Sequence, residues 1–400
     1  MKIRIAQMDM GLFTAVLVML GFGIVLVYSS SFALAQLKYG GADFFLARQS
    51  VRALLAIACF MVFVNVDYHF WGRISNLVYV FAVIMLLAVL FLPVSHVING
   101  ARRWISLGPL SFQVSDFARM ALVLVIARSC EKVGAEIVTI QNFVIMLVKI
   151  GVICLLILVE PNMSTAVVLG TVTLAMMFLS GARFTHIGLL FLAALPAALI
   201  LVLKTPYRMR RLMAFLHSSG SKESVGYQTY QSLIGLGNGG FFGVGLGKGE
   251  QKYFYLPEPH TDFAISILGE EIGFFGLMIV ISLFVFIIYR GMKAALHAPD
   301  KMGQLLAFGF TMTIAMYTII HASVGSGLIP TTGIPLPFLS YGGMSLVFMM
   351  SSMGVVLNIS SQSRYGMISP GNCQSGKTVG PRRKNIIDRI EMRKHQQRRA

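Results

Sequence analysis

The stretch GLFTAVLVMLGFGIVLVYSSSFALA, from Gly11 to Ala35, decides the fold class because it contains no charged residue. An α-helix rises about 1.5 Å per residue, so about 20 apolar residues cross the roughly 30 Å hydrocarbon layer of a membrane. The run is too long for the apolar core of a signal peptide and lacks a convincing cleavage site. We therefore predict that it is a retained first membrane span.

Further apolar runs of similar length follow along the chain. The predicted spans lie near residues 50–66, 74–93, 114–129, 142–160, 163–180, 184–203, 262–290, 303–323 and 338–360. Over its 400 residues the chain is 56% hydrophobic and only 12% charged, a balance that no soluble core of this size needs. The prediction is an all-α, polytopic membrane protein with about ten transmembrane helices.

Positive charge in this chain indicates topology. The net charge is +17, and placing both termini in the cytoplasm puts 19 of the 33 Lys and Arg residues on the cytoplasmic side. Nucleic acid is therefore not an expected partner. We divide the chain into a transmembrane domain, 1–361, and a basic tail, 362–400, which is too polar to fold alone and is predicted to be a disordered cytoplasmic segment. The four cysteines show neither disulfide nor zinc spacing.

The same topology places a long extracytoplasmic loop, residues 204–261, between the seventh and eighth spans. Its length favours function over mere connection. The loop ends in LPEPHTDF, which contains Glu258, His260, Thr261 and Asp262. An acid at the mouth of a membrane helix is costly unless it is paired or used, although Thr261 or Asp262 could simply cap the helix.

Helical geometry extends the pattern below Asp262. At 100° per residue, Ser266, Gly269 and Gly273 fall close to the same stripe of the helix as Asp262. Small residues along a membrane helix allow a neighbouring backbone to approach closely. We expect such an approach below the acid.

Two further acids follow in the same span. Glu270 flanks the stripe, and it is either a buried structural acid or a functional group. Glu271 points away, so we expect it to pair with Lys149 or with a basic residue of the loop.

The start of the long loop, YRMRR, supplies Arg208, Arg210 and Arg211. Guanidinium groups bind phosphate through planar, bidentate forks, so a phosphate site is predicted, with anchoring to lipid headgroups as the alternative. The glycine-rich part of the loop, 237–247, predicts a tight or re-entrant backbone and does not fit a nucleotide-binding loop.

A third unusual segment, GSGLIPTTGIPLPFLSYGG, runs from Gly325 to Gly343. Its repeated Pro and Gly residues exclude a continuous helix, so we predict an irregular plug or re-entrant segment. A rigid turn is the alternative.

Together these stretches resemble the SEDS family, the FtsW, RodA and SpoVE proteins of bacterial cell-wall synthesis. The resemblance covers nearly the whole chain, through NGARRWISLGPLSFQ, PYRMRRLMAFL, GYQTYQSLIGLGNGGFFGVGLG, QKYFYLPEPHTDF, GEEIGFFG and IPTTGIPLPFLSYGG. The form GVGLGKGEQKYFYLPE is more similar to the FtsW and SpoVE branches than to RodA.

The resemblance implies a peptidoglycan glycosyltransferase in the bacterial cytoplasmic membrane, at the division septum, that polymerises lipid II on the outer face. It implies a class B penicillin-binding protein and other divisome proteins as partners, with no certain cofactor beyond a divalent cation, Mg or Mn. It also implies Asp262 as the catalytic general base. The predicted substrate-binding residues are Arg208, Arg210, Arg211, Glu258, His260, Thr261, Gln231, Lys252, Trp104 and Ser340, and the predicted supporting acids are Glu160, Glu270 and Asp116.

The chain departs from the family pattern at four places. It has Asp116 where Glu is usual, followed by Arg119 where Lys is usual, and Asn162 two residues after Glu160 where Asp is usual. His321 and Ser323 stand where Asn and Gly are usual, and residues 264–267 also differ from the common run. These changes suggest a divergent branch in which Glu160 could replace the missing acid.

Two other functions remain open on the sequence. The first is a lipid II flippase that uses Lys149, Glu160 and Glu270 to line a path. The second is a scaffold that recruits and activates a penicillin-binding protein.

Overall fold

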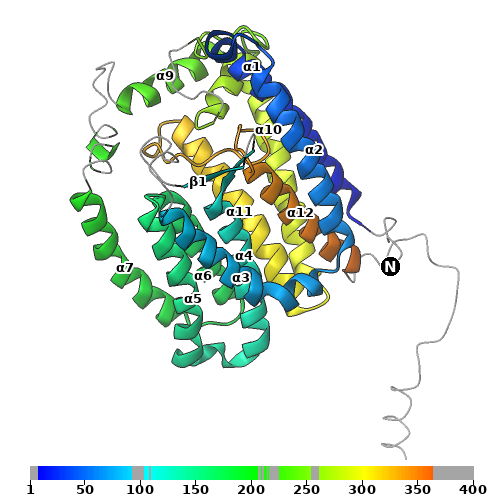
Figure 1. Ribbon diagram of the computed structural model, residues 1–400, viewed down its shortest axis with the longest axis vertical. Coiled ribbons are helices and arrows are strands. Elements are labelled where there is room, and N and C mark those ends of the chain that lie inside the picture. Colours follow the sequence, from blue (N-terminus) through cyan, green and yellow to red (C-terminus); the bar gives the residue numbers. More distant parts are fainter. Residues whose placement is uncertain are drawn as a thin grey trace, which may run out of the picture.

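In the part of the chain that the structure describes, the protein is a bundle of long helices with one short hairpin (Figure 1). The computed structural model describes residues 8–91, 103–107, 110–205, 209, 211–213, 215, 225–253 and 261–363. Within these ranges the helices are α1 (Met10–Tyr39), α2 (Phe44–Asn65), α3 (Tyr68–Leu90), α4 (Val114–Val133), α5 (Ile140–Val159), α6 (Met163–Leu179), α7 (Phe184–Lys204), α9 (Val225–Asn238), α10 (Ala264–Leu296), α11 (Lys301–Gly325) and α12 (Ser345–Gln362), with a 3-10 turn, η3 (Gly134–Val138).

Each of the ten predicted apolar runs overlaps one of these helices. By length and apolar composition, seven of the helices in the described ranges can cross a membrane: α1, α2, α3, α5, α10, α11 and α12, while α6 is a shorter apolar helix. The predicted multi-pass, helical membrane protein is therefore confirmed. The count of ten spans and the side on which the termini lie remain predictions.

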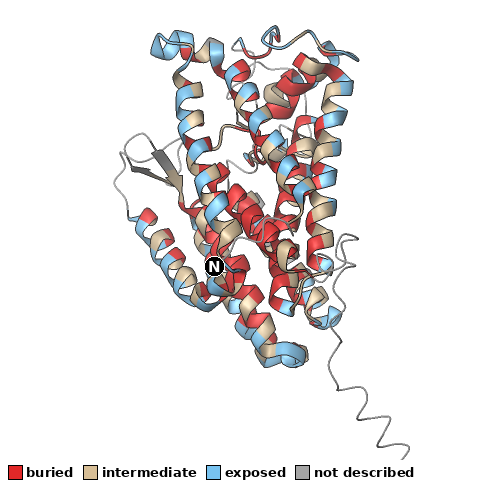
Figure 2. Ribbon diagram, turned by 90° about the vertical axis from the view of Figure 1, so that its right-hand side faces the viewer, coloured by how far each residue is buried: buried red, intermediate tan, exposed pale blue. Residues whose placement is uncertain are grey.

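The interior of the bundle is formed by α4, α11 and α12, whose residues are mostly buried. Figure 2 shows the buried residues gathered in the middle of the bundle and the exposed ones along the outer helices. The outer helices α2, α3 and α5 bury one stripe each and expose large apolar side chains elsewhere. Exposed apolar surface on long helices is what a lipid environment requires.

Helix α10 is broken at Gly273, whose backbone angles are φ 69° and ψ −171°. The loop after α9 meets the break: the Val244 amide donates to Glu270 O at 3.0 Å, and the Phe274 amide donates to Gly240 O at 2.9 Å. A Cβ on Gly273 would lie 2.2 Å from Gly243 N. The predicted tight backbone of the glycine-rich loop is confirmed, and it satisfies polar groups that the break leaves open.

The predicted close approach below Asp262 is also confirmed. The neighbour is α9 and the residues that follow it: a Cβ on Gly239 would lie 2.0 Å from Gly269 O. Nearer to Asp262 in the same contact, the hydroxyls of Ser232 and Ser266 are hydrogen-bonded to each other. The small residues of the stripe are therefore required by backbone packing.

Residues 326–344 form neither helix nor strand, as predicted. The last helix begins at Ser345, so the predicted start near residue 338 was wrong. The helix starts later for a local reason: Pro335 and Pro337 lack amide donors, and Phe338 adopts a left-handed φ of 63°. The carbonyl of Phe338 lies 2.1 Å from where a Cβ of Gly23 would stand, midway along α1. We call residues 330–343 the strap.

A β-hairpin precedes α4. Strand β1 (Trp104–Leu107) pairs antiparallel with β2 (Leu110–Gln113), and Trp104 lies opposite Gln113. The all-α prediction did not include this hairpin. The signal that could have shown it is Ile-Ser-Leu and Leu-Ser-Phe, in which apolar residues alternate with serine on either side of a Gly-Pro pair.

Candidate active site

The carboxylate of Asp262 lies against the strap. The residue precedes α10, and its Oδ2 is 3.8 Å from the position a Cβ would take on Gly333. Gly333 has φ 74°, a backbone conformation that residues other than glycine rarely adopt. The glycine therefore lets the strap backbone run beside the acid.

The loop arginine Arg211 reaches the same part of the strap. Its Nη1 donates to Thr331 O at 2.7 Å, two residues from Gly333. Arg211 and the Asp262 carboxylate therefore both lie beside the segment from Thr331 to Gly333.

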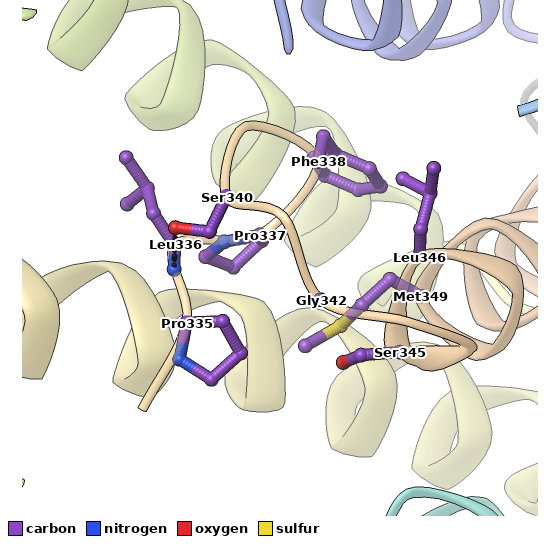
Figure 3. A pocket seen from close by; sticks show the side chains of 9 residues that line it. All are labelled: Pro335, Leu336, Pro337, Phe338, Ser340, Gly342, Ser345, Leu346 and Met349. Carbon is purple, nitrogen blue, oxygen red and sulfur yellow. Dashed lines mark hydrogen bonds between the residues drawn. The ribbon is translucent and has the colours of Figure 1, made fainter. Parts of the chain in front are cut away.

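Ser340 ties the far end of the strap to the segment that enters α10. Its hydroxyl donates to Thr261 O at 2.8 Å and accepts from the Leu336 amide at 2.9 Å. Figure 3 shows this serine at the turn of the strap, with Ser345 and Met349 from α12 on the other side of a small cavity. Ser340 and Thr261, both predicted substrate contacts, thus set the backbone next to Asp262.

Two helices hold the middle of the strap. From α6, the Ser164 hydroxyl donates to Thr332 O at 3.2 Å. From α11, Nδ1 of the buried His321 lies 2.8 Å from Ile334 O, so this nitrogen carries the proton. The carbonyls of Thr332 and Ile334, on either side of Gly333, are therefore anchored. Neither contact was predicted, since His321 was noted only as a departure from the family pattern and Ser164 has no feature in sequence that indicates a contact with the strap.

The connection between α5 and α6 places Glu160 near the hairpin. Arg103 Nε donates to Glu160 O at 2.8 Å, and its Nη2 donates to Pro161 O. The Glu160 side chain is 1% exposed, and its carboxylate oxygens have no hydrogen-bond partner among the described residues. Trp104 follows Arg103 and is half-buried. Asn162 makes a long contact, 3.4 Å, to the Ser115 hydroxyl.

Asp116 belongs to a buried pair inside the bundle. Its carboxylate lies 3.3 Å from Arg119 Nη1, one turn along α4, and the guanidinium lies over the ring of Tyr317. The altered residues thus still form an ion pair. This arrangement gives Asp116 a structural role, and support of catalysis by it remains a prediction.

The two acids of α10 have different partners. Glu271 pairs with Lys252 at 2.8 Å and accepts hydrogen bonds from Ser29, and both members of the ion pair are 1% exposed. Of the two partners expected for Glu271, the loop base is therefore correct. Lys149 instead donates to Ser129 Oγ at 2.8 Å.

Glu270 accepts the backbone amides of Glu250 and Gln251, the first at 2.9 Å. Of the two alternatives for this residue, the contacts favour the buried structural acid. The ion pair with Glu271 likewise accounts for Lys252 structurally. Binding of substrate by Lys252 remains a prediction, as it does for Gln231, which is 9% exposed on α9.

Four predicted site residues, Arg208, Arg210, Glu258 and His260, lie outside the described residues. Among the residues that are described, no three His, Cys, Asp or Glu side chains come together as a metal site. The divalent cation therefore remains a prediction.

A family model described as "cell cycle protein", covering FtsW, RodA and SpoVE, matches residues 10–365. The chain belongs to this family. The match spans every helix described above, so membership includes both the strap and the segment that carries Asp262.

Similar FtsW/RodA/SpoVE proteins include a probable peptidoglycan glycosyltransferase FtsW from Geobacter sp. (strain M18). It is 39% identical over 90% of this chain and 99% of its own length. The stage V sporulation protein E of Bacillus subtilis is also 39% identical, over 89% of this chain and 98% of its own.

Solved structures of the family agree with the fold. One, from work titled "Structural coordination of polymerization and crosslinking by a peptidoglycan synthase complex", has a TM-score of 0.73 at 25% identity. The rod shape determining protein RodA of Thermus thermophilus has a TM-score of 0.68 at 25% identity. Both comparisons cover 89% of this chain and 98% of the other.

Proposed function

We propose that this protein is a peptidoglycan glycosyltransferase that polymerises lipid II, the undecaprenyl-pyrophosphate-linked disaccharide-pentapeptide, with Asp262 as general base. The observation that supports it is the position of the Asp262 carboxylate beside Gly333, on a strap that Arg211 also contacts. Relatives named as probable peptidoglycan glycosyltransferases, at 39% and 37% identity, support the same reaction class.

The chemical step needs one base and one stabilised leaving group. The Asp262 carboxylate takes the proton of a sugar 4-hydroxyl, and the hydroxyl oxygen bonds to the anomeric carbon of a second lipid II. The bond from that carbon to the pyrophosphate oxygen breaks, and undecaprenyl pyrophosphate leaves with the electron pair. General-base assistance of this kind contributes about 10²–10⁴ in rate.

Arg211 can stabilise the leaving pyrophosphate. Its guanidinium already lies at the strap, and a fixed positive charge stabilises negative charge that develops in the transition state. Arg208 and Arg210 are proposed to act with it. A divalent cation, Mg or Mn, would supply the same stabilisation when bound. Among the described residues, the carboxylate of Asp262 would lie next to it.

Ser340, Ser164 and His321 position the reacting groups. Each holds a strap carbonyl or the backbone before Asp262. A displacement of about 1 Å at a reacting group can cost about 10²-fold in rate. These residues are therefore proposed as positioning residues.

The test is polymerisation of purified lipid II by the purified full-length protein, with and without its penicillin-binding partner. Asp262→Asn keeps the size of the side chain and removes the base, so we expect a loss of about 10²–10⁴-fold. The matched control is Glu136→Gln, the same chemical change at an exposed acid of η3. It should leave the rate unchanged.

Polymerisation by Asp262→Asn at the parental rate would refute the assignment of the base. If the parent forms no polymer but moves lipid II across vesicles, the flippase reading replaces the enzyme. If it does neither, but stimulates a penicillin-binding protein, the scaffold reading replaces it.

The same proposal includes topology and setting. Both termini lie in the cytoplasm, residues 204–261 face outward, and the protein acts at the division septum with a class B penicillin-binding protein and other divisome proteins. The solved relative from a peptidoglycan synthase complex supports such a partner. Depletion of this protein should block septation; a block in sporulation alone would place it with its SpoVE-like relative instead.

A further inference from the structure

The buried stripe of α2 contains two polar residues among apolar ones. Its buried positions are Phe45, Gln49, Arg52, Ala53, Ala56 and Phe60. Gln49 is 1% exposed and Arg52 is 2% exposed. Residues three apart lie on one face of a helix, so the two polar side chains are neighbours.

The polar atoms of these two side chains lack hydrogen-bond and ion-pair partners among the described residues. Both amide atoms of Gln49, and Nε and Nη1 of Arg52, are buried and make no hydrogen bond with any described residue. No described acidic side chain forms an ion pair with Arg52. Leaving a buried donor unsatisfied costs about 1–3 kcal/mol, and more for a charged group. A charge at such a position calls for an anionic partner.

The contact that Arg52 does make is aromatic. Its guanidinium carbon lies 4.6 Å from the ring centroid of Tyr341, and the same ring packs edge-on against Phe45 at 5.2 Å. A cation–π contact of this kind is worth about 0.5–2 kcal/mol. It leaves the N–H groups of the guanidinium free to donate to an acceptor.

This pair lies close to the candidate active site. Tyr341 follows Ser340, whose hydroxyl binds the carbonyl of the residue before Asp262. Arg211 contacts the strap at Thr331, near its start, and Arg52 contacts it at Tyr341, near its end. The strap therefore has one arginine at each end.

We propose that Gln49 and Arg52 form a second anion site, which binds the phosphate of a membrane lipid. The guanidinium fork and the carboxamide N–H₂ group offer several donors, and phosphate oxygens accept several hydrogen bonds. Lipid phosphates are the anions present at the end of a membrane helix. That this lipid is the second of two polyprenyl-linked substrates rests on the proposed function.

Access to the site requires a small movement, because Arg52 is closed over in this structure. The ring of Tyr341 covers it, and that residue is followed by Gly342 and Gly343, the second with φ 52°. Two glycines allow the backbone beside the ring to rotate at low steric cost. A ligand can thus reach the donors without a change in the helices.

The test measures binding by full-length protein in phosphatidylcholine nanodiscs to three probes: polyprenyl pyrophosphate, phosphatidylglycerol and inorganic pyrophosphate. We expect Arg52→Met to weaken binding of the lipid probes by about tenfold or more, because a charged hydrogen bond is lost. The loss of affinity for the lipid probes should be intermediate for Arg52→Lys and smaller for Gln49→Leu. Lys38→Met removes an exposed positive charge at the end of α1 and should change nothing.

The probes identify the source of the phosphate. Preference for polyprenyl pyrophosphate assigns the site to a substrate, and equal binding of phosphatidylglycerol assigns it to ordinary anionic lipid. Equal binding of inorganic pyrophosphate shows that the headgroup alone is recognised. Parental affinity of folded Arg52→Met for all three probes overturns the proposal. If Arg52→Met does not fold, parental affinity of both Arg52→Lys and Gln49→Leu overturns it.

Polymerisation is measured on the same preparations, which separates this inference from the proposed function. Arg52-dependent binding by a parent that makes no polymer refutes the polymerase and retains the anion site. Normal polymerisation with binding that does not depend on Arg52 refutes the anion site and retains the polymerase.

Discussion

The two ends of the helix bundle differ in whether their buried and half-buried polar groups have partners. At the end that contains Asp9, the carboxylate of Asp300 accepts from Tyr68 Oη at 3.0 Å and from the Gly303 amide at 2.7 Å, and it lies 2.8 Å from His69 Nε2. Arg290 binds both oxygens of Asp9, at 2.7 and 2.5 Å. These charges join the ends of several helices to one another.

At the end that contains Asp262, some buried charges are paired, such as Glu271 with Lys252, but several buried polar groups lack partners in the described part of the chain. Gln49, Arg52, Glu160 and Nε2 of His321 have none among the described residues. Near the Asp9 end, the unpartnered buried atoms belong to uncharged groups such as the Trp71 indole and the Ser180 hydroxyl. Buried polar groups are normally satisfied, so these exceptions, two of which (Arg52 and His321) contact the strap, indicate a place built for a ligand.

The largest expected contrast comes from the same substitution at both ends. Asp300→Asn should lower the free energy of unfolding by about 2–3 kcal/mol, since it weakens a helix cap and the contacts to Tyr68 and His69. Its polymerisation rate per folded molecule should stay at the parental level. Asp262→Asn should lower the polymerisation rate and leave the free energy of unfolding at the parental level.

Thermal unfolding and lipid II polymerisation of both variants measure this contrast. The comparison between the two ends fails if Asp300→Asn loses activity while its melting temperature is unchanged.

His321→Leu sharpens the role of the strap. The change leaves Ile334 O without its buried donor, at a cost of about 1–3 kcal/mol in positioning the strap. We expect polymerisation to fall by about tenfold. His321→Asn, which can still donate to the carbonyl, should recover most of the rate, whereas equal rates for the two variants would show that the hydrogen bond does not matter.

Ser340→Ala tests the other anchor of the strap. Loss of the hydrogen bond to Thr261 O, about 1 kcal/mol, should reduce kcat by about fivefold with little change in melting temperature. The control is Ser361→Ala, which removes a hydroxyl bound to Asn358 O at the opposite end of α12. A similar loss of kcat in both variants would contradict a specific role for Ser340.

Arg290→Lys should have the smallest effect. It replaces a bidentate contact to Asp9 with a single one on a partly exposed pair, so we expect a loss of about 0.5–1 kcal/mol in stability. Polymerisation should not change. A measurable loss of kcat would show that the Asp9 end is coupled to the site.

Much of the fold follows from hydropathy alone. The run from Gly11 to Ala35 appears within α1, and the glycines below Asp262 lie where α9 packs, because both patterns arise from local periodicity. The start of α12 was predicted seven residues too early, at 338 instead of 345. Apolar composition does not separate a helix from the buried strap that precedes it.

Part of the candidate site was visible in the sequence and part was not. Asp262, Arg211 and Ser340 belong to unusual motifs, and their segments meet at the strap. Gln49 and Arg52 were missed, although their spacing on the stripe from Phe45 to Phe60 could have shown two polar residues on a buried face.

The sequence by itself determined which segments enter a membrane and which residue types gather near Asp262, because hydropathy and motif composition are local properties of the chain. Only the tertiary structure decided which charges are satisfied. Lys252 forms an ion pair with Glu271, and Lys149 donates a hydrogen bond to Ser129. Among the described residues, the guanidinium of Arg52 contacts only an aromatic ring. Partners in an ion pair or hydrogen bond come from segments far apart in the chain, and their distance is set by how the helices pack.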